Sequence, residues 1–184
     1  MNFVAMDFET ASAQRHSAVS MALVVVRDNV LVDEFYTLIK PESYFDARNT
    51  KIHGITEADV ADAPKFPAVW DHIKQFYTPN QLVIAHNAPF DNGVLRETLG
   101  HYGISAPHYL SLDTVRTSRK LYPQLSNHKL NTVAAALNID LEHHHNALDD
   151  TVAAARILVT QAEQFGVDPV SYTHLRAHET VLDL

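Results

Sequence analysis

Two carboxylates separated by one residue end the first apolar run of the chain. Residues 2–6 are mostly apolar and lead directly into Asp7, Phe8 and Glu9. Because alternate side chains of a β-strand point to the same face, Asp7 and Glu9 are expected to lie side by side. Two neighbouring anions repel each other unless a cation lies between them, and a hard divalent cation prefers carboxylate oxygen. The pair indicates either a metal site or two solvated acids where a strand meets a polar loop.

Further acids stand where the sequence predicts that other elements begin. Asp91 falls in the first turn of a helix that follows a short buried strand, and Asp149 and Asp150 open the last predicted helix. Ligands of open α/β sheets bind in the crevice at such strand ends. His145 stands five residues before Asp150, and histidine titrates near neutral pH and can take a proton from water. We therefore expect these acids to meet at one site with a histidine beside them.

Apolar periodicity predicts the elements that must position these residues. The N-terminal part predicts three antiparallel strands joined by tight turns, with Asp28 and Asn29 in the second turn. The expected strands are 2–10, 17–26, 30–39, 81–85 and 109–112, and 40–48 is expected to be loop. The expected helices begin at Thr56 and near Pro67, run from about 90 to Gly103, and span 114–121, 129–137 and 147–165. This order predicts an α/β architecture with a mixed sheet flanked by helices.

Composition limits the kind of protein. The 184 residues are 46% apolar and 20% charged, which suits one globular domain. A net charge of -8 argues against coating nucleic acid through bulk charge, although metals bound at an acidic site add positive charge. The absence of cysteine excludes disulfides and thiolate metal sites. Without a signal peptide or an apolar run of roughly 20 residues, we expect a soluble cytoplasmic protein with no membrane partner.

Three motifs, in this order, resemble those of the DEDD exonucleases, in the subgroup whose last motif carries a histidine (DEDDh). They are D-F-E-T at 7–10, A-H-N-A-P-F-D at 85–91 and H-N-A-L-D-D at 145–150. H-G-I at 53–55 and N-H-K-L at 127–130 also recur in these proteins. The resemblance covers about residues 1–166 and is to the family of the DNA polymerase III ε subunit and RNase T. It implies a ribonuclease H-like mixed sheet with three antiparallel strands followed by parallel strands.

The resemblance implies hydrolysis of a 3′-terminal phosphodiester of DNA or RNA at two metal ions, releasing nucleoside 5′-monophosphates. In that family pattern Asp7 bridges the ions, and Glu9 and Asp150 hold the ion that activates water. Asp91 lies near the second ion, and His145 is the general base on the attacking water. Mg²⁺ is the expected ion and Mn²⁺ a substitute, because every metal ligand is a hard oxygen.

The resemblance also implies a pocket for the terminal nucleotide. Its expected residues are Phe8, Thr10, His53, Ile55, Asn87 and Phe90. Aromatic and apolar faces stack on bases without reading sequence. The alternative is that Phe8, Phe90 and Ile55 belong to the core and that His53 bonds to a loop carbonyl. His86 is expected to be structural rather than catalytic.

The register of the third motif is open from the residues alone. His144 and Asp149 have the same spacing as His145 and Asp150, and Ala147 favours the second pair. The run 143–145 is also compatible with zinc, but consecutive residues cannot all face one ion. We therefore expect His145 and Asp150 to be the functional pair, with no zinc site.

One basic stretch has two interpretations. It consists of Arg116, Arg119, Lys120 and Lys129. These side chains either contact phosphates or form a solvated helix face.

The character of the chain changes near its end. We expect an exonuclease domain over 1–168 and a tail over 169–184. Residues 171–180 have no clear period and resemble a read-through translation of sequencing-adapter DNA, so our hypothesis is that the tail is non-native. In that case the natural protein continues differently after about residue 170, and a further domain is one way it could continue. The alternative is an ordinary frayed C-terminus.

The expected function is a metal-dependent 3′–5′ exonuclease that acts in proofreading or repair on single-stranded or 3′-terminal nucleic acid. One alternative is a non-catalytic subunit that docks onto a polymerase, which the presence of all the expected catalytic residues disfavours. Another is an oligoribonuclease-like phosphodiesterase that acts on very short RNA. The partner is a DNA polymerase or a second copy of the chain, and the choice between DNA and RNA stays open.

Overall fold

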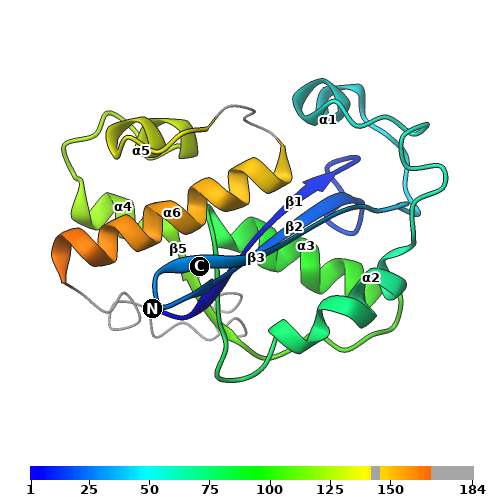
Figure 1. The fold of residues 1–184 in the computed structure, drawn as a ribbon. Coiled ribbons are helices and arrows are strands. Elements are labelled where there is room, and N and C mark those ends of the chain that lie inside the picture. Colours follow the sequence, from blue (N-terminus) through cyan, green and yellow to red (C-terminus); the bar gives the residue numbers. More distant parts are fainter. Residues whose placement is uncertain (142–145, 167–184) are drawn as a thin grey trace, which may run out of the picture.

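A mixed sheet forms the centre of the molecule (Figure 1). The structure, a computed structural model, describes residues 1–141 and 146–166, so His145 and the predicted tail lie outside the described residues. The strands are β1 (Phe3–Thr10), β2 (Ala18–Arg27), β3 (Val30–Leu38), β4 (Leu82–Ala85) and β5 (Leu110–Asp113). Their order is β3-β2-β1-β4-β5. The first three strands are antiparallel neighbours, as the sequence predicts, and β4 and β5 run parallel to β1, as the family resemblance implies.

The β2–β3 hairpin turns where its sequence predicts. Asp28 and Asn29 both adopt positive φ, 50° and 66°, which is the conformation that a two-residue type I′ turn requires. Arg27 pairs with Val30 directly across this turn. Asp and Asn tolerate the left-handed region better than other non-glycine residues, so the turn sets the register of the hairpin.

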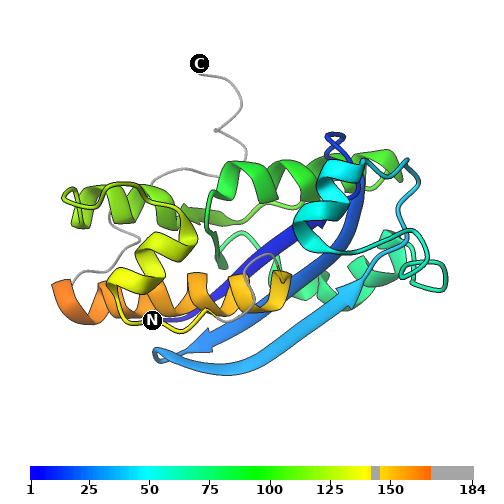
Figure 2. The same cartoon turned by 90° about the horizontal axis from the view of Figure 1, so that it is seen from above.

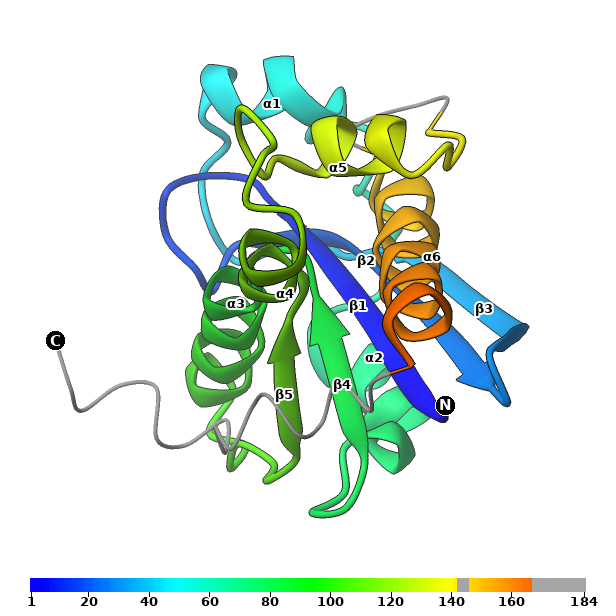
Figure 3. The ribbon, with the colours of Figure 1, turned by 90° about the vertical axis from the view of Figure 1, so that its left-hand side faces the viewer.

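Helices cover both faces of the sheet (Figures 2 and 3). They are α1 (Ala47–His53), α2 (Phe66–Ile73), α3 (Ala88–His101), α4 (Thr114–Leu121), α5 (Leu130–Ala136) and α6 (Ala147–Phe165), with a 3₁₀ turn, η1 (Lys74–Phe76), after α2. The core on one face contains buried side chains of α2 and α3, and the core on the other contains those of α5 and α6. In the described ranges, 1–141 and 146–166, no helix is long and apolar enough to cross a membrane.

The segment between β3 and α2 differs from its prediction. Residues 47 and 48, expected to be loop, begin helix α1, which Asp46 caps by accepting a hydrogen bond from the Arg48 N–H. The helix predicted to begin at Thr56 is instead a series of turns over 57–62. The carboxylate of Asp59 accepts hydrogen bonds from both the N–H and the hydroxyl of Thr56. These two hydrogen bonds satisfy the donors of Thr56 locally. Pro64 lacks the N–H that a continuing helix would use.

Strand β1 divides its side chains between the two cores. Val4, Met6 and Phe8 belong to the core beneath α2 and α3. Phe3 and Ala5 belong to the core beneath α6. Because side chains alternate along a strand, the two residues that continue the second series, Asp7 and Glu9, point to the α6 face.

Small side chains lie opposite these acids on β2. Asp7 is paired with Ala22, and Glu9 with Ser20. Residues directly opposite on an antiparallel pair share a face. The small partners leave room on this face for the start of α6, which carries Asp150.

A buried polar network ties α6 to α4. The Thr117 hydroxyl donates to Gln161 Oε1 over 2.7 Å, and Gln161 Nε2 donates to the Ser118 hydroxyl over 3.0 Å. Gln161 is 1% exposed. Because both ends of its amide are bonded, Gln161 sets how α6 lies against α4 and therefore where Asp150 is held.

We expect Gln161→Ala to destabilise the fold by roughly 2–4 kcal/mol, because it leaves a cavity and two buried hydroxyls without their partner. Urea unfolding followed by circular dichroism measures this loss. The matched control is Glu163→Ala, an exposed position on the same helix, which should stay within about 0.5 kcal/mol of wild type. Equal losses in the two variants would contradict the role assigned to the network.

Candidate active site

Three carboxylates meet at the carboxyl end of β1. Asp7 and Glu9 come from β1, and Asp150 comes from the first turn of α6. One carboxylate oxygen from each lies within 4.8 Å of the others. This group of three contains the pair that alternation on β1 predicts and the acid that the third motif predicts.

The start of α6 is held by its cap, which places Asp150. The Asn146 side chain accepts a hydrogen bond of 3.0 Å from the Leu148 N–H and a longer one from the Asp149 N–H. Asp150 is 6% exposed and joins Asp7 and Glu9, whereas Asp149 is not part of this group. Among the described residues, the geometry therefore favours Asp150 in the open choice between these two acids. His144 and His145, the histidines of that choice, lie outside the described residues.

Asp91 approaches from the other layer of the fold. It lies in the first turn of α3, is 1% exposed and accepts a hydrogen bond of 3.1 Å from the Phe8 N–H through Oδ1. Its charge acts on Asp7. The backbone of β1 therefore holds Asp91 beside the three-carboxylate group, although Asp91 is not one of the three.

Burial and mutual repulsion set the protonation of these acids. Burial raises the pKa of Asp7 well above its usual value, and the charges of Asp91, Glu9 and Asp150 raise it further. Burial, followed by the charge of Asp150, raises the pKa of Glu9 to about 8. Burial likewise raises the pKa of Asp91. Without a cation, Glu9 therefore holds a proton at neutral pH.

The donor set fits a hard divalent cation. Every candidate ligand is a carboxylate oxygen, and the chain has no cysteine. Mg²⁺ and Mn²⁺ prefer such ligands. A cation here would offset the repulsion among the acids and would displace their protons.

The predicted nucleotide pocket is assembled only in part. Phe8 is 2% exposed and belongs to the core beneath α2 and α3, where its ring lies 6.2 Å from that of Phe66. Since Phe8 and the acids point to opposite faces of β1, the structure favours the alternative that its side chain is core. Phe90 is half-buried and packs against the same core, with the Arg15 guanidinium 5.9 Å from its ring centre.

Helix α1 braces the end of β1. The Thr10 carbonyl accepts hydrogen bonds from Asn49 Nδ2, over 2.9 Å, and from His53 Nε2, over 3.2 Å. His53 Nδ1 accepts from the Ile55 N–H over 3.0 Å, which places the donor proton on Nε2. Ile55 is half-buried against the small cluster of Ala11, Val19 and Val60. His53 thus makes the carbonyl contact given as its alternative, while it also fixes the backbone next to Glu9.

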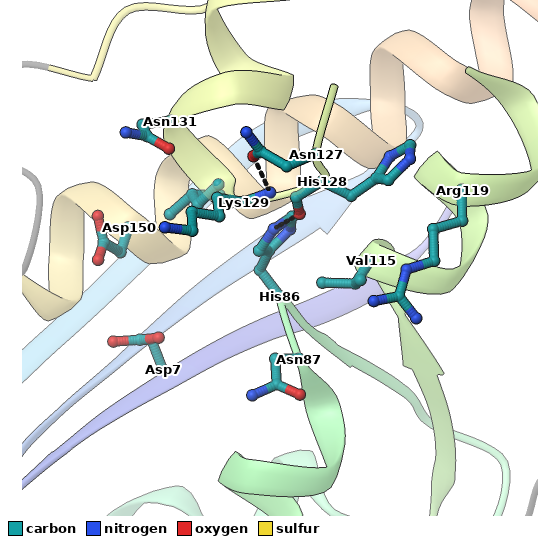
Figure 4. Close-up of a pocket in the computed structure, with 11 residues that line it drawn as sticks. Asp7, His86, Asn87, Val115, Arg119, Asn127, His128, Lys129, Asn131 and Asp150 are labelled. Carbon is teal, nitrogen blue, oxygen red and sulfur yellow. Dashed lines mark hydrogen bonds between the residues drawn. The ribbon is translucent and has the colours of Figure 1, made fainter. Parts of the chain in front are cut away.

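A pocket of about 730 Å³ opens beside the carboxylates (Figure 4). Its lining is Asp7, His86, Asn87, Val115, Arg119, Asn127, His128, Lys129, Leu130, Asn131 and Asp150. The acids lie on one side and Arg119 on the other, and the side chain of Lys129 extends toward Asp150. Of the predicted substrate residues, Asn87 alone lines this pocket, from the left-handed conformation that precedes α3, φ 83°.

His86, which the sequence predicts to be structural, joins three segments around the pocket, although its partners are not predicted. Its Nε2 donates to the His128 carbonyl over 2.9 Å, and its Nδ1 is hydrogen-bonded to the Thr114 hydroxyl over 2.8 Å. Next to it, the Asn87 N–H donates to the Asp113 carboxylate over 3.0 Å. One feature of the sequence could have predicted that these segments meet. Asp113 and Thr114 start a helix directly after a strand, which brings them to the same sheet edge as His86.

The family comparison agrees with this geometry. The sequence model of the exonuclease family (RNase T) matches residues 4–158. DNA polymerase III PolC-type from Caldanaerobacter subterraneus subsp. tengcongensis is 32% identical over 174 residues, 92% of this chain and 12% of that protein. The PolC-type polymerase of Clostridium perfringens is 35% identical over 158 residues, 85% of this chain and 11% of that protein. The chain thus spans about a tenth of the length of these curated relatives.

Solved structures share the fold. Exonuclease X in complex with 5′ overhanging duplex DNA has a TM-score of 0.75 and 26% identity, covering 91% of this chain and 95% of that chain. E. coli Exonuclease I in complex with a dA16 oligonucleotide has a TM-score of 0.80, covering 93% of this chain and 42% of that chain. Its identity is 18%, so this likeness concerns the fold alone. The predicted ribonuclease H-like mixed sheet is confirmed.

The metal-free protein should lose stability as pH rises toward 8. The folded-state pKa of Glu9, about 8, lies above its ordinary value of 4.5, so the folded protein binds more protons than the unfolded chain in this interval. Its melting temperature in EDTA should therefore fall between pH 5 and pH 8.5, at roughly 2–4 °C for each kcal/mol lost. Mg²⁺ should restore it at pH 8.5, because the cation neutralises the acids. Differential scanning calorimetry measures both effects.

The variants for this measurement are Asp150→Asn and its neighbour Asp149→Asn. Asp150→Asn should raise the melting temperature in EDTA at pH 8.5 and remove most of the Mg²⁺ effect, since one repelling ligand is gone. Asp149→Asn should behave like wild type. A Mg²⁺ effect that disappears in Asp149→Asn and survives in Asp150→Asn would reverse the assignment.

Proposed function

Because this chain belongs to the exonuclease family, we propose that it is a metal-dependent DEDD-type 3′–5′ exonuclease that degrades DNA to nucleoside 5′-monophosphates. The observation that carries this proposal is the convergence of Asp7, Glu9 and Asp150, with carboxylate oxygens within 4.8 Å of one another. Such a group, at the end of a central strand with Asp7 and Glu9 half-buried and Asp150 buried, is unfavourable on its own and suits cations that also bind phosphate.

Each carboxylate has a distinct place in the proposed reaction. Asp7 would contact both ions, Glu9 and Asp150 would hold one of them, and Asp91 would reach the second directly or through water. Two divalent ions bound there, Mg²⁺ or Mn²⁺, would stabilise the attacking and the leaving oxygen of the phosphodiester. The hydrogen bond from the Phe8 N–H keeps one Asp91 oxygen oriented, and the cap at Asn146 keeps Asp150 oriented. The site is thus preorganised by backbone contacts.

We assign the general base to His145. Its position in the chain supports this, because it directly precedes Asn146, the cap of the helix that carries Asp150. Its imidazole would take the proton of the attacking water, which is the task that a group with a pKa near neutrality performs best. The assignment rests on the third motif, because His145 lies outside the described residues.

DNA is the proposed polymer, with a single-stranded 3′ end as the reacting part. The similarity to Exonuclease X in complex with 5′ overhanging duplex DNA supports the choice of DNA as the polymer. The similarity to PolC-type DNA polymerases supports a proofreading role beside a DNA polymerase. Contact with a polymerase is part of the proposal and is separate from the chemistry of the site.

Digestion of 5′-labelled oligonucleotides tests the proposal. Single-stranded DNA and RNA of one sequence are incubated with Mg²⁺, with Mn²⁺ or with EDTA. We expect a ladder that shortens from the 3′ end of DNA, with 5′-monophosphates as product, and no reaction in EDTA. Glu9→Gln should lose at least about 100-fold in kcat, since it removes one metal ligand without changing the size of the side chain. A folded wild type that is inert with both metals would sink the proposal.

The general base is tested by two adjacent variants, His145→Gln and His144→Gln. His145→Gln should lower kcat by about 10²–10⁴-fold. It should also remove the acidic limb of the pH–rate profile, because the base no longer titrates. His144→Gln should keep both the rate and the profile. The reverse outcome would assign the base to His144.

A further inference from the structure

The basic stretch of the sequence is divided by the fold. Arg119 and Lys129 line the pocket beside the carboxylates, whereas Arg116 and Lys120 do not. Arg119 lies in the last turn of α4, and Lys129 lies just before α5. Two cations from different elements thus meet in one pocket of a chain whose net charge is -8.

The segment that carries Lys129 is fixed on both sides. The Asn127 side chain accepts a hydrogen bond of 3.0 Å from the Lys129 N–H. The His128 carbonyl accepts one of 2.9 Å from His86, which comes from the end of β4. His86 is itself bonded to Thr114, at the start of the helix that carries Arg119. His86 therefore links the segments of both cations.

The remaining lining suits a sugar–phosphate backbone. Asn87, Asn127 and Asn131 contribute amide groups, which donate to phosphate and sugar oxygens. Phe, Tyr and Trp, whose rings stack on bases, do not occur in this lining. A pocket with cations, amides and few apolar groups binds charge and does not select a base.

We propose that Lys129 and Arg119 form a subsite for backbone phosphates of the retained strand, on the 5′ side of the bond that is cleaved. The proposal rests on the proposed nuclease function and names the part of the substrate that this pocket takes. Lys129, which extends toward Asp150, binds the phosphate next to the scissile one, and Arg119 binds a phosphate farther along (Figure 4). His86 is a positioning residue, because it holds the Lys129 segment without touching the substrate.

Replacing one phosphate by a neutral methylphosphonate in the substrate tests the subsite. An oligonucleotide that carries this change one linkage upstream of the scissile bond should lower the wild-type kcat/KM about tenfold, since a contact between charges is lost. Lys129→Ala should be about tenfold slower on the unmodified strand and should lose no more than about twofold from the methylphosphonate. If the methylphosphonate and Lys129→Ala lower kcat/KM independently, so that the two losses multiply, the proposal is overturned.

Binding at equilibrium gives a readout that does not need turnover. The dissociation constant of a fluorescent single strand is measured by anisotropy in Ca²⁺ as a function of salt. Lys129→Ala and Arg119→Ala should each lower the slope of log K against log salt by about 0.7, the loss of one phosphate contact on a single strand. The matched control is Arg116→Ala, which removes the same charge from an exposed position of the same helix that does not line the pocket and should keep the wild-type slope.

The two measurements separate this proposal from the nuclease function. A wild type that binds with the expected slopes but does not cleave would contradict only the proposed function. A wild type that cleaves while both variants keep its slope would contradict only the subsite. His86→Ala should reproduce the slope of Lys129→Ala, and a wild-type slope would show that His86 does not position that segment.

Discussion

The repulsion among the crowded carboxylates at the end of β1 is the constraint on which the rest of the structure depends. Asp7 and Glu9 stand on one face of a central strand, and Asp150 is brought to them by α6. Burial raises the pKa values of Asp7 and Glu9, and the charges of the neighbouring acids raise them further. Protons or divalent cations must therefore compensate the site, and the fold has to supply enough stability elsewhere to hold it together. The buried amide of Gln161 and the Asn146 cap of α6 show where it does so.

The two layers of helices carry different residues of the site at this edge of the sheet. The layer with α4, α5 and α6 carries Asp150 and the cations of the pocket, and the layer with α2 and α3 carries Asp91. His86 bridges the pocket from the end of β4, through hydrogen bonds at both ring nitrogens. A cleaving end and a phosphate-binding end can thus lie side by side in one pocket, although the chain as a whole is acidic.

Local periodicity was enough to predict the strands, most of the helices and the shared face of Asp7 and Glu9. Alternation on β1 also places Phe8 on the opposite face. The family resemblance instead implied that Phe8 lies in the nucleotide pocket, and the two predictions were not compared. Helix α1 was missed because its cap, Asp46, lies in a stretch that begins with Pro41 and reads as loop. The bond from His86 to the His128 carbonyl joins segments 42 residues apart. No short-range pattern predicts such a contact. His145 and the tail lie outside the described residues, so their assignments stay predictions.

Direct counting of bound Mn²⁺ tests the central claim, that the three carboxylates hold cations. Electron paramagnetic resonance detects free Mn²⁺, so bound ions are obtained by difference while protein is titrated with Mn²⁺ in the presence of thymidine 5′-monophosphate. Wild type is predicted to bind about two ions per chain, and Glu9→Gln is predicted to bind fewer and more weakly. Free Mn²⁺ that tracks the total added, or identical binding in both proteins, would contradict the account.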